Sequence, residues 1–512
     1  MYKRQLLEGY GYPTIEADAN AFFGLTGLPL LTSSTFKIVY PEGKPVDPNA
    51  GVLTGWDIEI ALDVQWAHSI APGAKIVVVA ANGQDNEDFQ DAISYITKHH
   101  LGDSVNDSWE EDTDLVAGPL EQQSYDQVLK IAAAKGISFN FSTGDSGDEG
   151  LGSPIGAAGV PSNSPHATAV GGTSILNKVH GSGYETLGWG GDFVELNNSG
   201  VLDPPVPQPF FGGSGGGESV FFPKPSWQKD LPGTGRQTPD ISALADPFTG
   251  VPIVVTEGGV QGVQAGWGGT SLACPIFTAF WAIADQKAGH SLGLAGPAIA
   301  ALKPGVLVDV LPLSSPTNVT GTIVDQTGAT FYSATALFAG QIFGSTGFTS
   351  AVWDVGGGED LALAFGLDTS LTVTKGWDNV TAVSYTHLDP AGYLWLELSR
   401  GDCDLGRVRA CLHPARRPAR DYVQRGSAVR ALRDWICAAG MVFAALLRLP
   451  AWVGGQPAAR HGTPLGWHAR GRSSCGDDGR AGRDLRSRLC VEFRLLVYGF
   501  RSGPARIGCT RP

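Results

Sequence analysis

The sequence predicts an α/β fold with a mainly parallel central sheet, because helical patterns alternate with short apolar strands. Residues 75–80 read Lys-Ile-Val-Val-Val-Ala, a run typical of a strand that is buried on both faces. Residues 86–99 follow with apolar side chains at helical spacing. Alternation of this kind is typical of parallel sheets. We therefore expect the functional side chains in loops past the carboxyl ends of strands.

The helices and strands are predicted in order along the chain. Residues 62–70 predict a helix that Ala71-Pro72-Gly73 ends, and residues 120–135 predict another, closed by Gly136. The apolar residues 276–285 read as a helix that begins shortly after a serine. Further strands are predicted at residues 137–142, 167–173 and 251–256. The Pro- and Gly-rich residues 204–217 predict a surface loop.

The composition divides the chain into two unlike parts. Residues 1–388 hold 13 Lys and 2 Arg against 40 Asp and Glu, whereas residues 390–512 hold no Lys and 21 Arg against 9 acidic residues. Residues 383–389, Val-Ser-Tyr-Thr-His-Leu-Asp, resemble a translated sequencing-library linker, and residues 1–5 resemble its other side. We interpret residues 6–382 as a gene fragment and residues 390–512 as an out-of-frame translation without defined structure.

Several classes of protein are disfavoured by this composition. A basic nucleic-acid-binding tail is the alternative for residues 390–512, but the arginines lack aromatic interleaving and helical period. The acidic part shows no signal peptide, no membrane-spanning stretch and no phosphate-binding Gly-x-x-x-x-Gly-Lys-Ser/Thr loop. We therefore expect neither nucleic acid nor membrane as a partner. The acidic excess suits a protein that works at low pH, where protonation relieves self-repulsion.

The segment Gly268-Gly269-Thr270-Ser271 places a serine near the start of a predicted helix. Small residues before Ser271 let a substrate backbone come close, and helix-start N–H groups favour developing negative charge. This setting suits a serine nucleophile in acyl transfer. The alternative is a Gly-rich turn in which Ser caps the helix.

Three carboxyl groups supply candidate partners for the serine. Glu59 and Asp63 are four residues apart, on one face of a helix and among apolar neighbours. Two carboxylates held close titrate together and can act as a proton-sharing base. Asp145 follows a predicted strand, where a protonated carboxyl could donate to a substrate oxyanion. The alternatives are a solvated acidic helix face and an Asx-turn.

Taken together, the motifs resemble those of the sedolisins, serine-carboxyl peptidases with a subtilisin-like three-layer fold. Glu59-x-x-x-Asp63, then Gly144-Asp145-Ser146-Gly147, then Gly269-Thr270-Ser271-x-x-x-Pro275 occur in the family's order and at comparable spacings. Other matching stretches lie at residues 71–76, 170–173 and 239–243, so the resemblance runs from about residue 8 to residue 381. The resemblance implies an acid-acting peptidase that works through an acyl-enzyme.

The resemblance also implies a role for each residue. Ser271 matches the nucleophile, Glu59 its general base, Asp63 the residue that orients Glu59 and shares its proton, and Asp145 the acid of the oxyanion hole. Ser108, Trp109, Gly144 and Gly269 match the surroundings of the substrate. One Ca²⁺ is implied, held by Asp309, Val310, Thr374, Gly376 and Asp378, and ligation by oxygen alone suits this ion. Protein or peptide substrates, a monomer, secretion and a prodomain in the precursor are further implications.

The sequence departs from the family pattern at three places. Ser108-Trp109-Glu110 stands where family chains usually have Ser-Trp-Gly, so this edge of the substrate site should differ. The segment expected after Asp378 is cut off after residue 382, and we expect the fold's first strand, before Glu8, and the prodomain to be missing. Such a fragment could be inactive.

Two rival functions were weighed against the peptidase. A Ser-His-Asp subtilisin needs a His-Gly-Thr segment before the serine, and this chain has one only at His461, after it. His68 and His166 lack that context. A non-catalytic protein on the same fold is the second rival, against which all four catalytic candidates are present.

Overall fold

The computed structural model describes residues 3–148, 156–177, 184–196, 202–203, 210–303, 306–312, 320–325, 328–333, 349–356, 359–366, 368, 370–382, 467–470 and 492–495. Of residues 383–512, which include the linker-like segment and the Arg-rich tail, it thus describes two short strands.

A central sheet of eight strands organises the fold, in the order β10-β9-β6-β4-β1-β3-β2 with β16 beside β9. All neighbouring pairs are parallel except β10 with β9. The strands are β1 (Lys3–Gly9), β2 (Phe36–Val39), β3 (Lys75–Ala81), β4 (Ser104–Asp107), β6 (Ser138–Ser142), β9 (Thr168–Asn177), β10 (Tyr184–Gly188) and β16 (Ile241–Leu244). The predicted mainly parallel sheet is confirmed.

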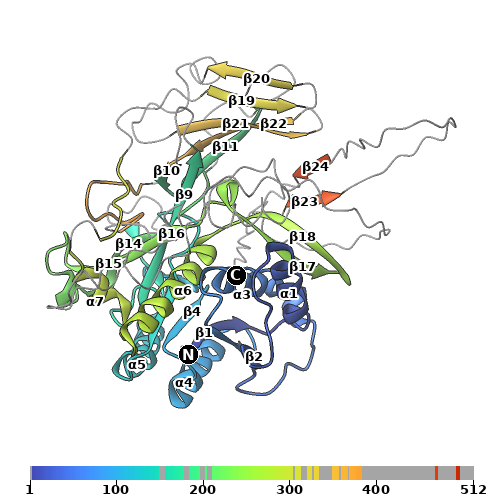
Figure 1. The fold of residues 1–512 in the computed structure, drawn as a ribbon. Helices are drawn as coiled ribbons and strands as arrows, with labels where there is room; N and C mark the ends of the chain where they lie inside the picture. Colours follow the sequence, from blue (N-terminus) through green and yellow to red (C-terminus); the bar gives the residue numbers. More distant parts are fainter. Residues whose placement is uncertain are drawn as a thin grey trace, which may run out of the picture.

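Helices cover both faces of this sheet, which gives three layers (Figure 1). On one face α3 (Trp56–Ile70) packs against α6 (Thr270–Ala288) and α1 (Ile15–Thr26). On the other face α4 (Asn86–His99) packs against α5 (Pro119–Ala134). Buried Leu, Ile, Val and Phe side chains from sheet and helices form one continuous core. The shorter helices are α2 (Ala50–Thr54), α7 (Ala295–Ala300), η1 (Ser226–Gln228) and η2 (Pro247–Thr249).

The remaining strands form smaller sheets, of which β19 to β22 lie beyond one end of the central sheet (Figure 1). One sheet joins β12 (Leu202–Asp203), β11 (Gly190–Leu196), β22 (Glu359–Phe365) and β21 (Thr349–Gly356), with β13 (Phe210–Gly213) beside β11. Another joins β15 (Gly235–Thr238), β14 (Gly216–Pro223) and β7 (Gly156–Ala157). A third joins β17 (Val251–Glu257), β18 (Val260–Trp267), β23 (Trp467–Arg470) and β24 (Glu492–Leu495). Two pairs remain, β19 (Thr320–Asp325) with β20 (Gly328–Ser333), and β5 (Asp112–Thr113) with β8 (Gly159–Val160).

Two expectations from the sequence are wrong. The first strand is present, because β1 lies between β3 and β4 with Leu6 and Leu7 fully buried. Residues 210–217 form β13 and the start of β14 rather than a surface loop, and residues 212–217 are buried. Small glycines allow this close packing. Residues 204–209 lie outside the described residues. The strand predicted at residues 251–256 is confirmed as β17, which pairs antiparallel with β18 outside the central sheet.

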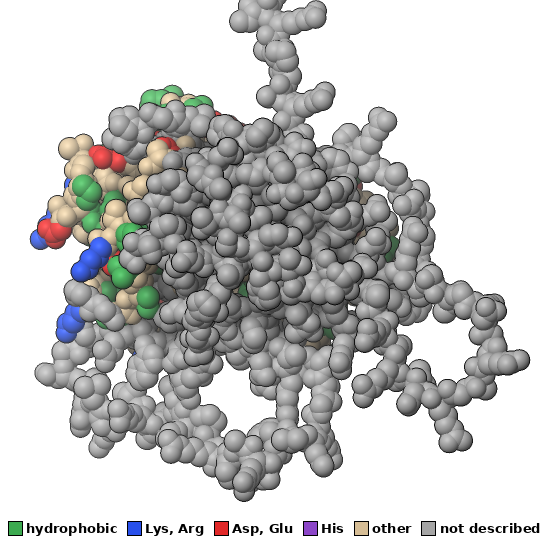
Figure 2. Space-filling model, turned by 90° about the horizontal axis from the view of Figure 1, so that it is seen from above, with side chains coloured by type: hydrophobic (Ala, Val, Ile, Leu, Met, Phe, Trp, Pro, Cys, Tyr) green, Lys and Arg blue, Asp and Glu red, His purple; other side chains and the backbone are tan. Residues whose placement is uncertain are grey.

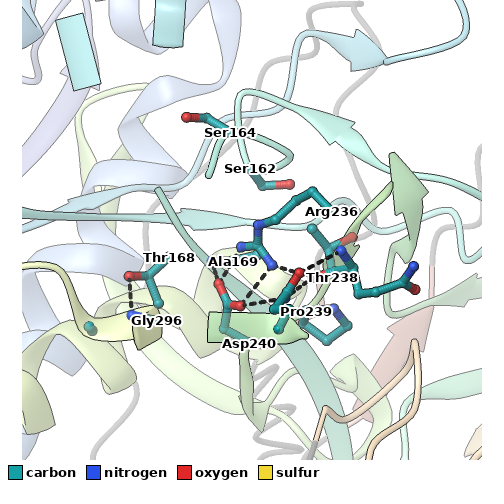
Figure 3. A network of polar contacts seen from close by, with 12 residues as sticks. Ser162, Ser164, Thr168, Ala169, Arg236, Thr238, Pro239, Asp240 and Gly296 are labelled. Carbon is teal, nitrogen blue, oxygen red and sulfur yellow. Dashed lines mark hydrogen bonds and ion pairs between the residues drawn. The ribbon is translucent and has the colours of Figure 1, made fainter. Parts of the chain in front are cut away.

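A buried ion pair holds the turn between β15 and β16 against β9 (Figure 3). Arg236 is fully buried and donates from Nη1 to Oδ1 of Asp240 over 2.8 Å, while Nη2 meets Oδ2 at 2.5 Å. Oδ2 also accepts the backbone N–H of Ala169 in β9, at 2.9 Å. The guanidinium lies 4.9 Å from the ring centre of Trp227. Each charge therefore has a partner, as buried charges require.

The outer surface adds two observations. No helix in the described ranges is long and apolar enough to cross a membrane. Seen from above, the described side chains at one flank mix acidic, basic and hydrophobic groups rather than gathering one kind (Figure 2).

Candidate active site

Helix α3 carries the acidic pair Glu59 and Asp63 one turn apart. Asp63 is fully buried and Glu59 is half-buried, and the apolar side chains between them, among them Ile60 and Leu62, are buried in the core. The helix therefore turns this pair toward the interior of the molecule. A fully solvated acidic face, the alternative interpretation of this spacing, does not form.

Strand β4 supplies the hydrogen-bond donors that surround Asp63. Ser108 Oγ, just past the end of β4, lies 3.1 Å from Oδ1 and 3.2 Å from Oδ2 of Asp63, and the Asn106 amide donates to Oδ2. Burial, and then the charge of Glu59, raise the pKa of Asp63 well above its usual range. Asp63 is thus held by donors from β4, and its link to Glu59 is electrostatic.

Glu59 lies between Asp63 and the serine. Burial is the main cause that raises the pKa of Glu59 to about 8, and the charge of Asp145 adds to the rise. Hydrogen bonds from Ser271 and Ser108 oppose it. Oε1 of Glu59 is buried without a hydrogen-bond partner among the described residues. A carboxyl with a raised pKa beside a hydroxyl is the arrangement needed for proton transfer.

Ser271 lies in the first turn of α6, which begins at Thr270 rather than near residue 276 as the apolar pattern predicted. Four residues on, Pro275 has no N–H, so the Ser271 carbonyl lacks its usual helical donor. Ser108 Oγ instead lies 3.2 Å from that carbonyl oxygen. The Ser-x-x-x-Pro spacing therefore leaves the serine backbone open to a contact from β4, and Ser271 stays partly exposed.

Asp145 follows β6 and reaches the start of α6. The backbone N–H of Thr270 donates to its Oδ1 over 2.7 Å, and the Thr270 hydroxyl does so over 2.8 Å. Although Asp145 is exposed as a residue, desolvation of its carboxyl raises its pKa, and the Thr270 bonds oppose this rise. Gly269 is needed here because a Cβ would lie 2.6 Å from Oδ2 of Asp145, at a φ of +89°. This carboxyl is therefore fixed next to the serine.

Two further buried carboxyls were missed by sequence reasoning. Glu8, the last residue but one of β1, shares a hydrogen bond with the Asp63 carboxyl. Asp107 ends β4, and neither of its carboxyl oxygens has a hydrogen-bond partner among the described residues. Both side chains are fully buried. Burial is the main cause that raises the pKa of both carboxyls well above the usual range. The charge of Asp63 raises the pKa of Glu8 further, and the charge of Glu59 does the same for Asp107. Their position at the carboxyl ends of central strands was the available signal.

The residues predicted to surround the substrate lie around this group. Trp109 is half-buried and stacks on Phe89, with ring centres 4.9 Å apart. Gly144 is buried at a φ of +91°, and its carbonyl accepts the Thr270 hydroxyl over 3.1 Å. Ser108 lies at the Ser271 carbonyl and Gly269 at the Asp145 carboxyl, whereas Trp109 packs on aromatic rings of α3 and α4.

Neither histidine considered for a Ser-His-Asp site is bonded to Ser271. His68 is buried in α3, where its Nε2 lies 2.8 Å from the Pro29 carbonyl, and burial lowers its pKa to about 4. His166 pairs with Asp126 at 2.7 Å. His461 lies outside the described residues.

The predicted calcium ligands converge on the turn at residues 374–378. Asp309 Oδ2 accepts the N–H of Gly376 over 3.0 Å, and Asp378 Oδ2 accepts the N–H of Thr374 over 3.1 Å. Oδ1 of Asp309 is buried without a hydrogen-bond partner in the described part of the chain. Val310 is buried beside it. Burial raises the pKa of Asp378 to about 6. In the described residues no group of three or more His, Cys, Asp or Glu could hold a metal, so main-chain oxygens would have to complete a site.

Comparison with known proteins shows similarity to peptidases. The profile of the subtilase family matches residues 50–302. Kumamolisin from Bacillus sp. (strain MN-32) is 33% identical over 52% of this chain and 45% of its own length. Sedolisin from Pseudomonas sp. (strain 101) is 29% identical over 54% and 45%, and tripeptidyl-peptidase 1 of Homo sapiens 26% identical over 59% and 49%. The chain thus spans about half the length of these curated relatives.

The fold is that of a solved relative as well. The structure of Pseudomonas sedolisin, a serine-carboxyl proteinase complexed with pseudo-iodotyrostatin, matches with a TM-score of 0.53 at 22% identity, over 75% of this chain and 89% of that one. The subtilisin-like fold is therefore confirmed, and residues 50–302 match the subtilase family. Within that family, the named relatives that it resembles are sedolisin-type peptidases.

Proposed function

We propose that this chain is an acid-acting serine-carboxyl peptidase, with residues 6–382 as the peptidase domain, and that it hydrolyses peptide bonds through an acyl-enzyme on Ser271. The observation that carries the proposal is that the Ser271 hydroxyl bonds to Glu59 while Asp145 is bonded to the neighbouring Thr270 at the start of α6. Asp63 interacts with Glu59 by its charge. Peptidases of this chemistry need no histidine base.

In the first half of the reaction, the Ser271 oxygen bonds to the scissile carbonyl carbon while its proton passes to Glu59. The carbonyl oxygen becomes negative and accepts a hydrogen bond from protonated Asp145. Glu59 then gives its proton to the amide nitrogen, the C–N bond breaks, and the amine leaves. The acyl group remains on Ser271.

In the second half, water replaces the amine. Glu59 takes a proton from the water, whose oxygen bonds to the acyl carbon, and Asp145 again donates to the oxyanion. The bond to Ser271 breaks, and the serine oxygen recovers a proton from Glu59. The serine proton leaves with the amine and is replaced by a proton from water, so the residues end as they began.

Two protonation states set the pH dependence of the proposed activity. Asp145 can donate only while protonated, and its raised pKa extends that state above the usual range for Asp. Glu59 accepts a proton only while ionised, so its own raised pKa, about 8, opposes activity at low pH unless the neighbouring carboxyls hold the shared protons. Because it interacts with Glu8, Asp63 and Asp107, its ionisation belongs to the group. We expect a bell-shaped pH profile, whose alkaline limb reports Asp145.

Calcium and location follow as parts of the same proposal. Asp309 and Asp378, with main-chain oxygens of Val310, Thr374 and Gly376, would hold one Ca²⁺, which would neutralise both carboxylates and fix this turn. Calcium titration of the wild-type chain and of Asp309→Asn, followed by calorimetry, tests this. We also propose peptide substrates, secretion and a monomer.

Two substitutions test the peptidase with a fluorogenic peptide at about pH 4. Ser271→Ala should lower kcat/KM by at least about a thousandfold, because it removes the nucleophile. Asp145→Asn should retain activity at higher pH than the wild type, since an amide donates a hydrogen bond whatever the pH. Ser34→Ala, an exposed serine before β2, is the matched control.

The outcomes separate the candidate functions. Unchanged cleavage in Ser271→Ala would remove Ser271 as the nucleophile. An activity that disappears below about pH 6 would favour a histidine base instead. A wild-type chain that binds peptides without cleaving them at any pH would support the non-catalytic rival.

A further inference from the structure

Glu110 lies beside the candidate active site and has no role in the chemistry above. It comes two residues after Ser108, whose Oγ lies 3.2 Å from the Ser271 carbonyl oxygen. Directly after it, the N–H of Glu111 donates to the Val160 carbonyl over 3.0 Å, which begins the pairing of β5 with β8. Both ends of the short segment that carries Glu110 are therefore held.

The carboxylate of Glu110 fills the space between two glycines. A Cβ at Gly144 would lie 1.9 Å from its Oε2, and a Cβ at Gly159 would lie 1.8 Å from its Oε1. Gly144 immediately precedes Asp145. This carboxyl group thus lies against the backbone that carries Asp145, where the sedolisin pattern has a glycine and no side chain.

The residues next to Glu110 and the glycine that it lies against are held in place. Trp109 stacks on Phe89 at 4.9 Å and lies 5.9 Å from Trp56. The Gly144 carbonyl is held by the hydroxyl of Thr270 and by the N–H of Gly215. Glu110 itself is half-buried, so it keeps contact with solvent. A carboxylate held in one place at the edge of a site selects partners by charge.

We propose that Glu110 is a specificity-determining residue that selects a Lys or Arg side chain on the residue whose carbonyl is attacked. This inference rests on the proposed function. In the proposed mechanism the scissile carbonyl lies between Ser271 and Asp145. The side chain of the residue that carries this carbonyl then extends along the segments that contain Glu110 and Gly144. A cationic group there meets the carboxylate, whereas an acidic group is repelled.

The test compares two peptides that differ only in arginine or norleucine at the attacked residue. In the wild-type chain, kcat/KM should favour arginine by about tenfold or more, as a close charge pair allows. Glu110→Gln, which keeps the size of the side chain, should reduce that ratio to near one. Glu111→Gln is the matched control, because Glu111 is the exposed neighbour, and it should leave the ratio unchanged.

A second measurement keeps the proposal independent of turnover. In Ser271→Ala, fluorescence anisotropy of the same two labelled peptides should show tighter binding of the arginine peptide, and Glu110→Gln in that background should abolish the difference. An unchanged preference in Glu110→Gln, or no preference in the wild type by either measurement, overturns the role of Glu110. Absence of cleavage with a Glu110-dependent binding preference would overturn the peptidase and leave this subsite standing.

Discussion

Two groups of buried charged side chains lie on opposite parts of this fold, and they are neutralised in different ways. At the turn between β15 and β16, Arg236 and Asp240 meet in an ion pair, and burial raises the pKa of Asp240 while Arg236 opposes the rise. At the carboxyl ends of β1 and β4, Glu8, Asp63 and Asp107 gather with no ion pair to Lys or Arg among the described residues. The first group is stabilised by a cation, and the second can be made neutral only by protons.

The comparison shows how a single fold separates stability from function. An ion pair with matched hydrogen bonds is insensitive to pH over the range in which proteins work. Carboxyls without cations hold protons that can be moved, at the cost of a fold that depends on pH. The candidate site is therefore placed where the stability of the fold depends on bound protons.

The largest expected effect comes from breaking the ion pair. Arg236→Met leaves Asp240 buried without its cation and should lower the free energy of unfolding by about 3–5 kcal/mol. Urea unfolding followed by fluorescence measures the change. Arg236→Met combined with Asp240→Leu should recover part of the loss, because the second change removes the uncompensated charge. A double variant less stable than the single one would mean that the pair's role is not electrostatic.

A smaller effect follows from the carboxyls as pH rises. In the unfolded chain Glu59 ionises at about pH 4.3, but in the fold its pKa is raised to about 8, so the folded state binds the extra proton between these values. Stability should therefore be fully present below about pH 4 and decline toward pH 8. Asp285, whose pKa burial raises to about 7, acts in the same direction. Thermal unfolding across this range measures the decline, and a flat or rising melting temperature would contradict it.

The smallest expected effect is on the stability of a variant that replaces one buried carboxyl, Asp107. Asp107→Asn replaces a buried carboxyl that has no hydrogen-bond partner in the described structure by an amide that cannot ionise. At low pH the two chains should unfold alike, and near neutral pH the variant should be more stable by about 1 kcal/mol. Asp47→Asn, an exposed aspartate in a loop, is the control and should follow the wild type. A variant that is destabilised equally at every pH would show that Asp107 acts by packing.

The bounds of helices were predictable where the local sequence pattern agrees with the packing of the element in the fold. Helix α4 matches its predicted range, and α5 differs by one residue at each end, because amphipathic spacing marks both helices and glycine and proline flank α5. Strand β17 forms where it was predicted, but its antiparallel partner was not predictable, since an apolar run does not tell a parallel strand from a buried antiparallel one. Strand β1 was missed because its first residues resemble a linker. Its central place in the sheet depends on its pairing with β3 and β4, which the sequence does not display.

Some residues of the candidate site were predictable from the sequence and others were not. Motif resemblance found Glu59, Asp63, Asp145 and Ser271, which the fold brings together from distant segments. It could not find Glu8, because a single acidic residue at the end of a strand has no pattern of its own. The electrostatic link between Glu59 and Asp63, with Ser108 as the hydrogen-bonding intermediary, also depends on strand register, which a sequence does not display.

Pro275 has a consequence for recognising degenerate copies of this protein. Because it releases the serine carbonyl from the helix, a duplicate gene that kept the serine but replaced this proline would regain an internal helical bond and withdraw that carbonyl from its contact with Ser108. Such a copy would still carry the serine hydroxyl. Loss of the proline would then alter the backbone of the candidate site while all four candidate side chains stayed in place.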